Sequence, residues 1–342
     1  MNADVPRGGA RLEAVAVHLP EHVETNAELH RLFPEWNVLE AARHTGVEQR
    51  YLSAPDETAL DLAEQACLRL FGDQPQLKEA LDLVLFCTQT PDHRLPSNAC
   101  LLHGRLGLHS RVGALDINLA CSGFTYSLIL ANGLIESGTA RNILLVTADT
   151  YTKLIGKQDR STRLLFSDGA AATWITRSEG TSRVLGSAWG SDGALYQAFC
   201  VPGGAARLPT PPEPLKLLTD GLNLRTRDQI QMDGKGMLRF TSLTLPQHLQ
   251  ELLSAHGLTL EDVPHFLFHQ ASAMVLDGLR SRLHLDEARV HRNLAMTGNT
   301  VSASLPILLH DTLAQSGIQR GETILLSGFG AGLSWASVLL VY

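Results

Sequence analysis

The stretch Asn118-Leu119-Ala120-Cys121-Ser122-Gly123-Phe124 decides how this chain is interpreted, because a buried strand gives way to a helix there. Before it, residues 112–120 form an apolar run that predicts a strand, and a helical pattern begins after it. The small residues at positions 121–123 form the turn between the two. The stretch therefore predicts a strand-turn-helix unit with a thiol at the N-terminus of the helix.

Cys121 is a candidate nucleophile because of this position. The N-terminus of a helix carries a partial positive charge, which favours thiolate over thiol. The alternative is a small buried packing residue, as most free cysteines are. We interpret Cys67, Cys87 and Cys100 in that second way, since Cys67 lies in a helical run and Cys87 ends the apolar run 81–86.

Composition places the chain among ordinary soluble globular proteins, with 342 residues, 44% hydrophobic and 18% charged, and a net charge of -7. Lys and Arg are scattered without basic runs, so nucleic acid is not an expected partner. No apolar run reaches the roughly 18 residues of a membrane span, and residues 1–11 lack an apolar signal core. Five cysteines without a C-x-x-C pair predict neither disulfides nor a metal site. We expect a cytoplasmic protein.

Strands alternate with helices along the chain, which predicts an α/β fold with a covered sheet. In the first half we expect strands at residues 83–88, 112–120, 142–148 and 170–176. The helix after Cys121 should bury Phe124, Leu128, Ala131 and Ile135 and end near Gly138.

The second half repeats this order after a proline-rich segment at 203–221, which predicts a long loop. We expect strands at 265–268, 323–327 and 334–341, and helices at 273–283 and 301–314. The boundary is placed near residue 178, giving halves 1–178 and 179–342.

Polar residues follow the second-half strands, where ligands meet open α/β sheets. His269 follows the strand 265–268, and Asn299 precedes the helix 301–314. Each alone is ambiguous, because most histidines are not catalytic and Gly-Asn is also an ordinary turn sequence. The glycine-rich tail 327–332 is either a tight connection or backbone whose N–H groups form an oxyanion hole.

Cys, His and Asn in this order admit two chemistries. One is a papain-like hydrolase, and the separation of Cys121 from His269 fits it. The local sequence does not, because the C-G-[SA]-C-[WY] context of those enzymes is missing around Cys121. The other is acyl transfer with carbon–carbon bond formation.

Eight short motifs run in register through the chain, at residues 45–50, 96–100, 118–124, 166–170, 232–235, 269–272, 298–300 and 328–332. In these motifs the chain resembles the β-ketoacyl-acyl-carrier-protein synthase III family of the thiolase superfamily, from about residue 11 to 342. The resemblance implies a thiolase-like, five-layered α-β-α-β-α fold built from two similar βαβαβ halves, usually as a homodimer.

The resemblance also implies roles for the candidate residues. Cys121 would take an acyl group from acyl-CoA, with the oxyanion held by the N–H groups of Cys121 and Ala331. His269 and Asn299 would stabilise the enolate formed when malonyl-CoA or a malonyl carrier protein loses carbon dioxide. A β-ketoacyl thioester, condensed by related Claisen chemistry, is the alternative extender. No metal or cofactor is implied beyond these thioesters.

Four further residues are implied to bind substrate. Trp36 and Arg160 would flank the CoA adenine, Ser272 would bond a pantetheine amide, and Phe329 would lie beside the malonyl carboxylate. Core packing is an equally good interpretation of Phe329.

The chain departs from the family pattern in four places. His44 stands where an arginine that contacts CoA is expected, and Met274 removes a cation from the surface that receives the carrier protein. Leu95 replaces a phenylalanine that closes the acyl pocket across the dimer, which predicts a donor longer than acetyl. Ala336 replaces a glycine conservatively.

These departures favour a specialised, polyketide-like condensing enzyme over one that initiates fatty-acid synthesis. Acyl transfer to a hydroxyl or amine is a third possibility, although the presence of both His269 and Asn299 argues against it. A catalytically silent partner subunit is a fourth, and Cys121 argues against that.

Overall fold

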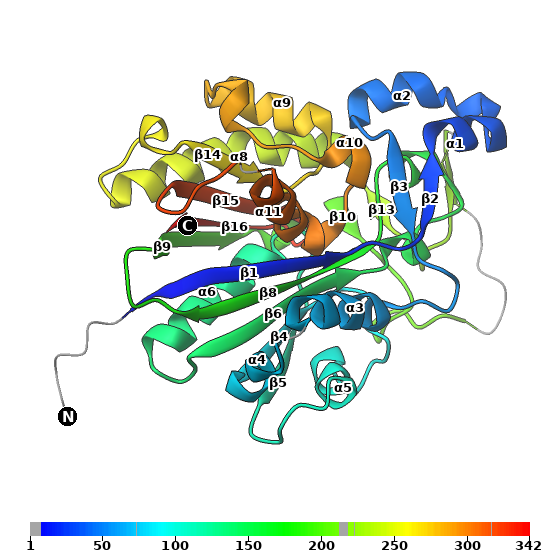
Figure 1. Cartoon of the computed structure of the whole chain (residues 1–342). Helices are drawn as coiled ribbons and strands as arrows, with labels where there is room; N and C mark the ends of the chain where they lie inside the picture. The colour runs from blue at the N-terminus through cyan, green and yellow to red at the C-terminus, as the bar shows by residue number, and fades with distance from the viewer. Residues whose placement is uncertain (1–7, 73, 212–217, 222, 316) are drawn as a thin grey trace.

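Two β-sheets organise the computed structural model, which describes residues 8–72, 74–211, 218–221, 223–315 and 317–342 (Figure 1). The first sheet has the order β1 (Ala10–His18), β8 (Gly169–Arg177), β6 (Asn142–Asp149), β4 (Leu83–Cys87) and β5 (Gly113–Ile117). The second has the order β14 (His265–Phe268), β15 (Thr323–Gly330), β16 (Ser334–Val341) and β9 (Arg183–Ser191). The first sheet thus ends before residue 178 and the second begins after it, and the division into halves at 178 stays a prediction.

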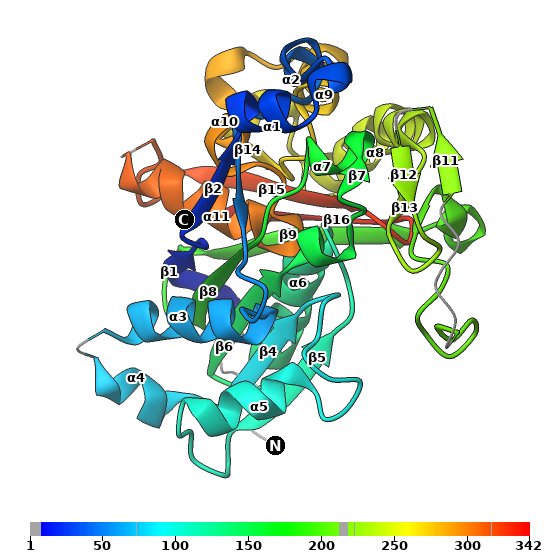
Figure 2. The same cartoon turned by 90° about the vertical axis from the view of Figure 1, so that its right-hand side faces the viewer.

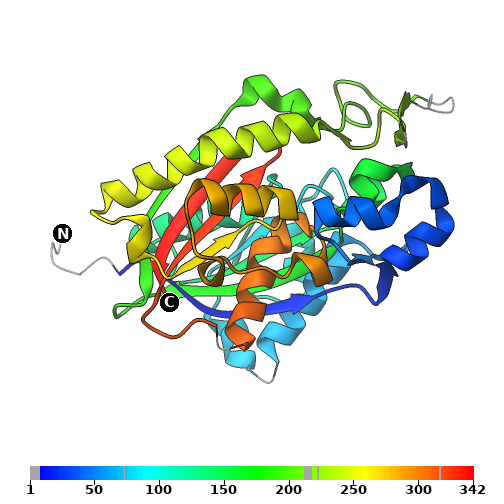
Figure 3. The same ribbon diagram turned by 90° about the horizontal axis from the view of Figure 1, so that it is seen from above.

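Helices cover both faces of each sheet, which gives the predicted α-β-α-β-α layers (Figures 1 and 2). The central layer, between the sheets, contains α6 (Gly123–Glu136) and α11 (Ser304–Ala314). On the outer face of the first sheet lie α3 (Ala59–Phe71), α4 (Pro75–Ala80) and α5 (Asn98–Arg105). Figure 3 shows α8 (Gly234–Ala255) and α9 (Ala273–Arg282) over the second sheet.

Helix α6 is apolar on more than one side because it lies between the two sheets. Phe124, Leu128, Ala131 and Ile135 are fully buried, as predicted, because α6 packs against strands of both sheets. Helix α6 ends at Glu136, two residues before Gly138, whose φ of 76° suits a glycine after a helix.

Smaller elements border the sheets. They are β2 (His22–Thr25), α1 (Asn26–Leu32), α2 (Val38–Thr45), β3 (Gln49–Leu52), β7 (Gln158–Asp159), α7 (Arg160–Arg163), β10 (Phe199–Cys200), β11 (Leu218–Asp220), β12 (Asn223–Arg225), β13 (Gln231–Met232) and α10 (Leu294–Thr297). Helix α2 contacts α9. In the part of the chain described, no helix has the length and apolarity to cross a membrane.

Three predicted elements differ from those observed. Strand β5 stops at Ile117, so the predicted strand 112–120 is too long, and the exposed Asn118 begins the turn to α6. Strand β15 runs to Gly330, three residues beyond the predicted end, because residues 328–330 of the glycine-rich tail still pair with β16. The predicted helix 301–314 begins as a 3₁₀ turn, Val301–Ala303, before α11.

The predicted loop at 203–221 is irregular over residues 203–211 but ends in β11, and residues 212–217 lie outside the described part. Cys67 and Cys87 are fully buried, as predicted. Cys100 is exposed, so its interpretation as a packing residue is wrong. The buried side of α5 is formed by other residues, namely Asn98, Ala99 and Leu102.

Candidate functional site

Cys121 lies between β5 and α6 with its backbone pressed against β15. A Cβ atom on Gly330 would lie 2.8 Å from Cys121 Cβ and 3.0 Å from Sγ, and one on Gly328 would lie 2.7 Å from the Cys121 carbonyl oxygen. Larger residues at these two positions would displace the thiol. The glycines of the tail therefore let strand β15 approach the backbone and thiol of Cys121 closely.

The Cys121 thiol is buried, with 3% of the residue exposed. Burial raises the pKa of this thiol, the charge of Asp149 raises it further, and a backbone N–H lowers it by less. The predicted thiolate is therefore not the resting form. The thiol has to lose its proton as it reacts.

His269 follows β14 and is held by Ser304, the first residue of α11. His269 Nδ1 lies 2.9 Å from Ser304 Oγ, which also accepts the N–H of Gln270 at 2.9 Å. The single hydroxyl proton is then directed to Nδ1, so the bonding network assigns the imidazole proton to Nε2. Burial lowers the pKa of His269 to about 3, so the ring is a neutral donor at physiological pH.

Asn299 is fixed by its own side-chain oxygen. Asn299 Oδ1 accepts the N–H of Val301 at 3.0 Å, which turns Nδ2 toward the Ala271 carbonyl at 3.5 Å. A primary amide has two N–H groups, so Nδ2 keeps a donor for a ligand. Asn299 and His269 therefore both present neutral N–H donors.

One cavity of about 110 Å³ brings five of the predicted residues together: Cys121, His269, Asn299, Ser272 and Phe329. The Phe329 ring lies edge-on to the His269 ring, with centroids 5.6 Å apart. Ser272 caps α9 by accepting the N–H of Val275 at 3.3 Å. A serine in this role still has its own proton to donate.

A second cavity of about 580 Å³ lies beside the first and holds Ala331, the residue after β15. Phe199 lines both cavities, and the end of β15 borders both as well, with its last residue Gly330 in the first and Ala331 in the second. Leu119, two residues before Cys121, also lines the second cavity. Cys121 therefore lies between two spaces.

Three predicted substrate-binding residues lie outside both cavities. Trp36 is only 2% exposed and stacks on Phe33 with ring centroids 3.9 Å apart, which covers one face of the indole, and its contact with the CoA adenine stays a prediction. Arg160 begins α7 and is half-buried. Leu95 is 81% exposed.

Four residues next to the site were missed from the sequence: Ser304, Asp149, Gln89 and Tyr151. Asp149 ends β6, and Gln89 follows β4 by two residues, so the rule that placed ligands at strand ends would have found both. Burial raises the pKa of Asp149 to about 7 against the effect of its hydrogen bonds. Nothing in the local sequence of Ser304 reveals its contact with His269, because that contact joins two separate elements.

Comparison with known proteins gives consistent matches over the chain. A family model for 3-oxoacyl-[acyl-carrier-protein] synthase III matches residues 115–193, and the model for the C-terminal part of that family matches residues 253–342. The β-ketoacyl-[acyl-carrier-protein] synthase III of Caldanaerobacter subterraneus subsp. tengcongensis is 35% identical, covering 94% of this chain and 95% of the relative.

Solved structures of related enzymes also match nearly the whole chain. A crystal structure of a 3-oxoacyl-(acyl-carrier-protein) synthase III has a TM-score of 0.94 and 38% identity, covering 98% of this chain and all of the other. The priming β-ketosynthase from the R1128 polyketide biosynthetic pathway has a TM-score of 0.80 and 28% identity, covering 100% and 99% of the two chains.

Proposed function

Because this chain belongs to the 3-oxoacyl-[acyl-carrier-protein] synthase III family and is a condensing acyltransferase, we propose that Cys121, His269 and Asn299 catalyse its reaction. The observation that supports this most is that all three line one cavity, with a thiol facing two neutral N–H donors. A papain-like hydrolase is not supported, because the fold and family are those of condensing enzymes.

In the first step the thiol of Cys121 attacks the thioester carbonyl of an acyl-CoA. The new bond joins Sγ to the acyl carbon, the carbon–sulfur bond to CoA breaks, and the thiol proton leaves with the CoA sulfur as CoA-SH. His269 Nε2 already carries a proton and does not accept this one. The N–H groups of Cys121 and Ala331 are proposed to hold the oxyanion.

In the second step a malonyl thioester enters the cavity with its thioester oxygen toward His269 and Asn299. Loss of carbon dioxide leaves an enolate, and the two neutral donors stabilise the charge on its oxygen. The enolate carbon attacks the acyl carbonyl, the bond to Cys121 Sγ breaks, and the thiolate takes a proton from solvent water, which restores the thiol. Phe329 places an apolar ring near the departing carboxylate, which favours its loss as neutral carbon dioxide.

Substrate recognition is proposed as follows. Ser272 bonds a pantetheine amide, and Arg160 contacts the nucleotide of CoA. The 580 Å³ cavity supports a donor longer than acetyl. The extender rides on CoA or an acyl carrier protein, and no metal or cofactor is proposed, since both substrates are already activated thioesters. We place the reaction in the cytoplasm, in fatty-acid initiation or in specialised, polyketide-like biosynthesis.

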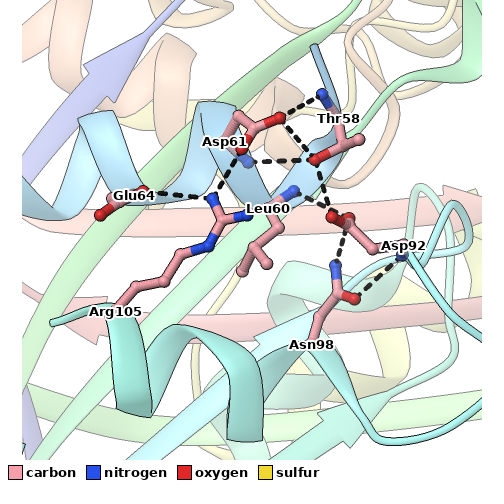
Figure 4. Close-up of polar contacts among 7 residues, drawn as sticks. All are labelled: Thr58, Leu60, Asp61, Glu64, Asp92, Asn98 and Arg105. Atoms are coloured by element: carbon pink, nitrogen blue, oxygen red, sulfur yellow. Dashed lines mark hydrogen bonds and ion pairs between the residues drawn. The ribbon is translucent and has the colours of Figure 1, made fainter. Parts of the chain in front are cut away.

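We also propose a homodimer in which Leu95 contacts the partner subunit. Leu95 is 81% exposed although its loop is well anchored. Figure 4 shows the anchor: Asp92 accepts hydrogen bonds from Thr58 (2.8 Å) and from Asn98 Nδ2 (3.3 Å), which ties the loop to α3 and α5. A single exposed leucine is ordinary on a protein surface, so the proposal rests on the family resemblance, in which the side chain at this position reaches across the dimer. Leu95→Glu should shift the protein to monomers in analytical ultracentrifugation, whereas Leu39→Glu, at another exposed leucine, should not.

The catalytic proposal is tested by separating the two steps. The protein is offered acetyl- to dodecanoyl-CoA, and the acyl-enzyme is weighed by intact mass spectrometry. Malonyl-CoA and malonyl carrier protein are then offered separately, and products are analysed. Cys121→Ala should abolish acyl-enzyme, whereas Cys100→Ala, at an exposed cysteine, should not.

His269→Ala and Asn299→Ala should keep the acyl-enzyme and lose condensation. Condensation at the native rate in His269→Ala would refute the assigned mechanism. Preferential loading of acetyl would refute the longer donor, and transfer to an added hydroxyl or amine without decarboxylation would favour the alternative acyltransferase.

A further inference from the structure

We propose that the 580 Å³ cavity beside Cys121 binds an acyl chain that carries a neutral oxygen, a hydroxyl or a ketone, recognised by Gln89 and Asn118. This inference rests on the proposed function, because it names the chemical class of the acyl donor. It distinguishes the enzyme from one that loads plain alkyl chains.

A directed chain of hydrogen bonds runs along the wall of this cavity. The Tyr151 hydroxyl donates to Gln89 Oε1 at 2.6 Å, and Gln89 Nε2 donates to Asn118 Oδ1 at 3.1 Å. Tyr151 is 3% exposed, so the chain begins at a fixed hydroxyl. Each amide uses its oxygen as an acceptor here, which sets the direction in which its NH₂ group points.

Because the amide oxygens of Gln89 and Asn118 act as acceptors in this chain of hydrogen bonds, N–H donors of both side chains remain at the cavity. A primary amide carries two N–H groups, and Gln89 uses one of them on Asn118. The second N–H of Gln89 and the NH₂ group of Asn118 are then available to an acceptor in the cavity that both residues line. The cavity wall therefore offers N–H donors, and a ligand oxygen matches them.

The position of the cavity fits an acyl chain attached to Cys121. Leu119, two residues before Cys121, and Ala331, which follows the Gly330 that packs against Cys121, both line it. Leu154, Phe199 and Ile230 form its apolar part, which suits the carbon stem. The rings of Tyr151, Phe166 and Phe199, with centroids 5.6 to 6.4 Å apart, separate this cavity from the one that holds His269.

The charges favour a neutral oxygen over a carboxylate. Asp228 lines the cavity, and among the described lining residues there is no Lys, Arg or His. Arg227 pairs with this aspartate (Nε to Oδ1, 3.6 Å) but does not line the cavity, so a carboxylate on the acyl chain would face Asp228 without a cation in the described wall itself. A plain alkyl chain would cover the amide N–H groups without bonding them, and sites built on hydrogen bonds discriminate strongly against analogues that lack the matching group.

The test compares donors of equal length: hexanoyl-CoA and its 3-hydroxy, 5-hydroxy and 5-oxo derivatives. The rate constant for acylation of Cys121 is measured by intact mass spectrometry over a range of donor concentrations. We expect at least one oxygenated donor to load tenfold faster than hexanoyl-CoA. In Gln89→Leu, which removes the amide, this ratio should fall to about one while hexanoyl-CoA still loads.

Two more variants keep the result interpretable. Tyr151→Phe removes only the hydroxyl that orients Gln89, so it should lower the ratio in a protein with native circular dichroism. Tyr126→Phe removes a hydroxyl that lines neither cavity and donates to the Gly190 carbonyl at 2.9 Å, so it should leave the ratio unchanged.

Two results would overturn the proposal: hexanoyl-CoA loading as fast as every oxygenated donor, or an unchanged ratio in Gln89→Leu. In either case, the proposed function would still hold if hexanoyl-CoA forms an acyl-enzyme and this acyl-enzyme condenses with a malonyl thioester. Absence of any acyl-enzyme in the wild-type protein would instead refute the proposed function.

Discussion

Asp149 accepts both hydrogen bonds that Ser302 can donate, from its backbone N–H at 3.2 Å and from its hydroxyl at 2.5 Å. The other carboxylate oxygen accepts the N–H of Gln89 at 2.8 Å and the hydroxyl of Thr88 at 3.3 Å. One fully buried carboxylate thus joins the end of β4, next to the second cavity, to the segment that follows Asn299. Both proposed binding spaces depend on it.

The substitution Asp149→Asn should impair condensation more than acyl-enzyme formation. An asparagine keeps one oxygen but turns its NH₂ group toward donors, so part of the network loses its acceptor. We expect a loss of about 2 kcal/mol in the free energy of unfolding at pH 8 and a fall of about tenfold in condensation. Urea unfolding and single-turnover kinetics measure the two. Asp192→Asn, at the half-buried N-cap of the 3₁₀ helix 193–198, is the control, and equal values for Asp149→Asn and wild type would contradict this role.

The raised pKa of Asp149 should make the stability of the protein depend on pH. Burial raises the pKa of Asp149 to about 7, so between about pH 4 and pH 7 the folded protein binds a proton that the unfolded chain releases. This contribution is full below the ordinary carboxyl pKa and is lost as pH rises through 7. Wild type should therefore lose about 3 kcal/mol relative to Asp149→Asn between pH 5 and pH 8. Parallel urea titrations at the two pH values test this, and a constant difference would exclude the raised pKa.

Ser304 should act as a positioning residue for His269. Ser304→Ala removes the hydroxyl proton from His269 Nδ1, which lets the neutral ring adopt the tautomer without a proton on Nε2. We expect condensation to fall at least tenfold while the rate of acyl-enzyme formation stays near that of wild type. Ser304→Thr restores the hydroxyl and should rescue condensation. An equal loss in both steps would indicate a general structural defect instead.

Gly330 should be intolerant of any side chain. In Gly330→Ala the added methyl group would meet Cys121 Cβ at 2.8 Å and Sγ at 3.0 Å, and the backbone of β15 is paired with β16 and cannot yield easily. The variant should lose both acyl-enzyme formation and labelling of Cys121 by iodoacetamide. Gly104→Ala has nothing within 4 Å of the added atom and should behave as wild type. Normal acylation in Gly330→Ala would show that the thiol has room to move.

Most of the fold could be predicted from hydrophobic pattern and motif order, because apolar runs such as the one in β6 and the helical stripe of α6 are local signals. Ends of elements were less predictable. The polar Asn118 stops β5 early, and the glycines of β15 remain in the strand because β16 pairs with them.

The catalytic positions could be predicted from motifs, but their electrostatic state could not. The turn before α6 suggested a thiolate at Cys121, whereas burial by distant segments reverses the direction of the pKa shift. Trp36 is buried for a similar reason, since its hydrophobic cluster includes Leu164, which lies far along the chain. Partners from other elements, such as Ser304 for His269, become visible only when the sheets are assembled.

The alkylation of Cys121 should therefore depend on pH without help from His269. Because burial raises the pKa of the thiol, the thiolate fraction grows with every step in pH, and labelling by iodoacetamide should still be accelerating at pH 9. His269, with its pKa lowered to about 3, stays neutral throughout and supplies no positive charge, so His269→Ala should give the same profile from pH 6 to pH 9. Peptide mass spectrometry reads Cys121 and the exposed Cys100 in the same samples, which makes Cys100 the internal reference. A plateau below pH 7 that disappears in His269→Ala would instead reveal a thiolate-imidazolium pair.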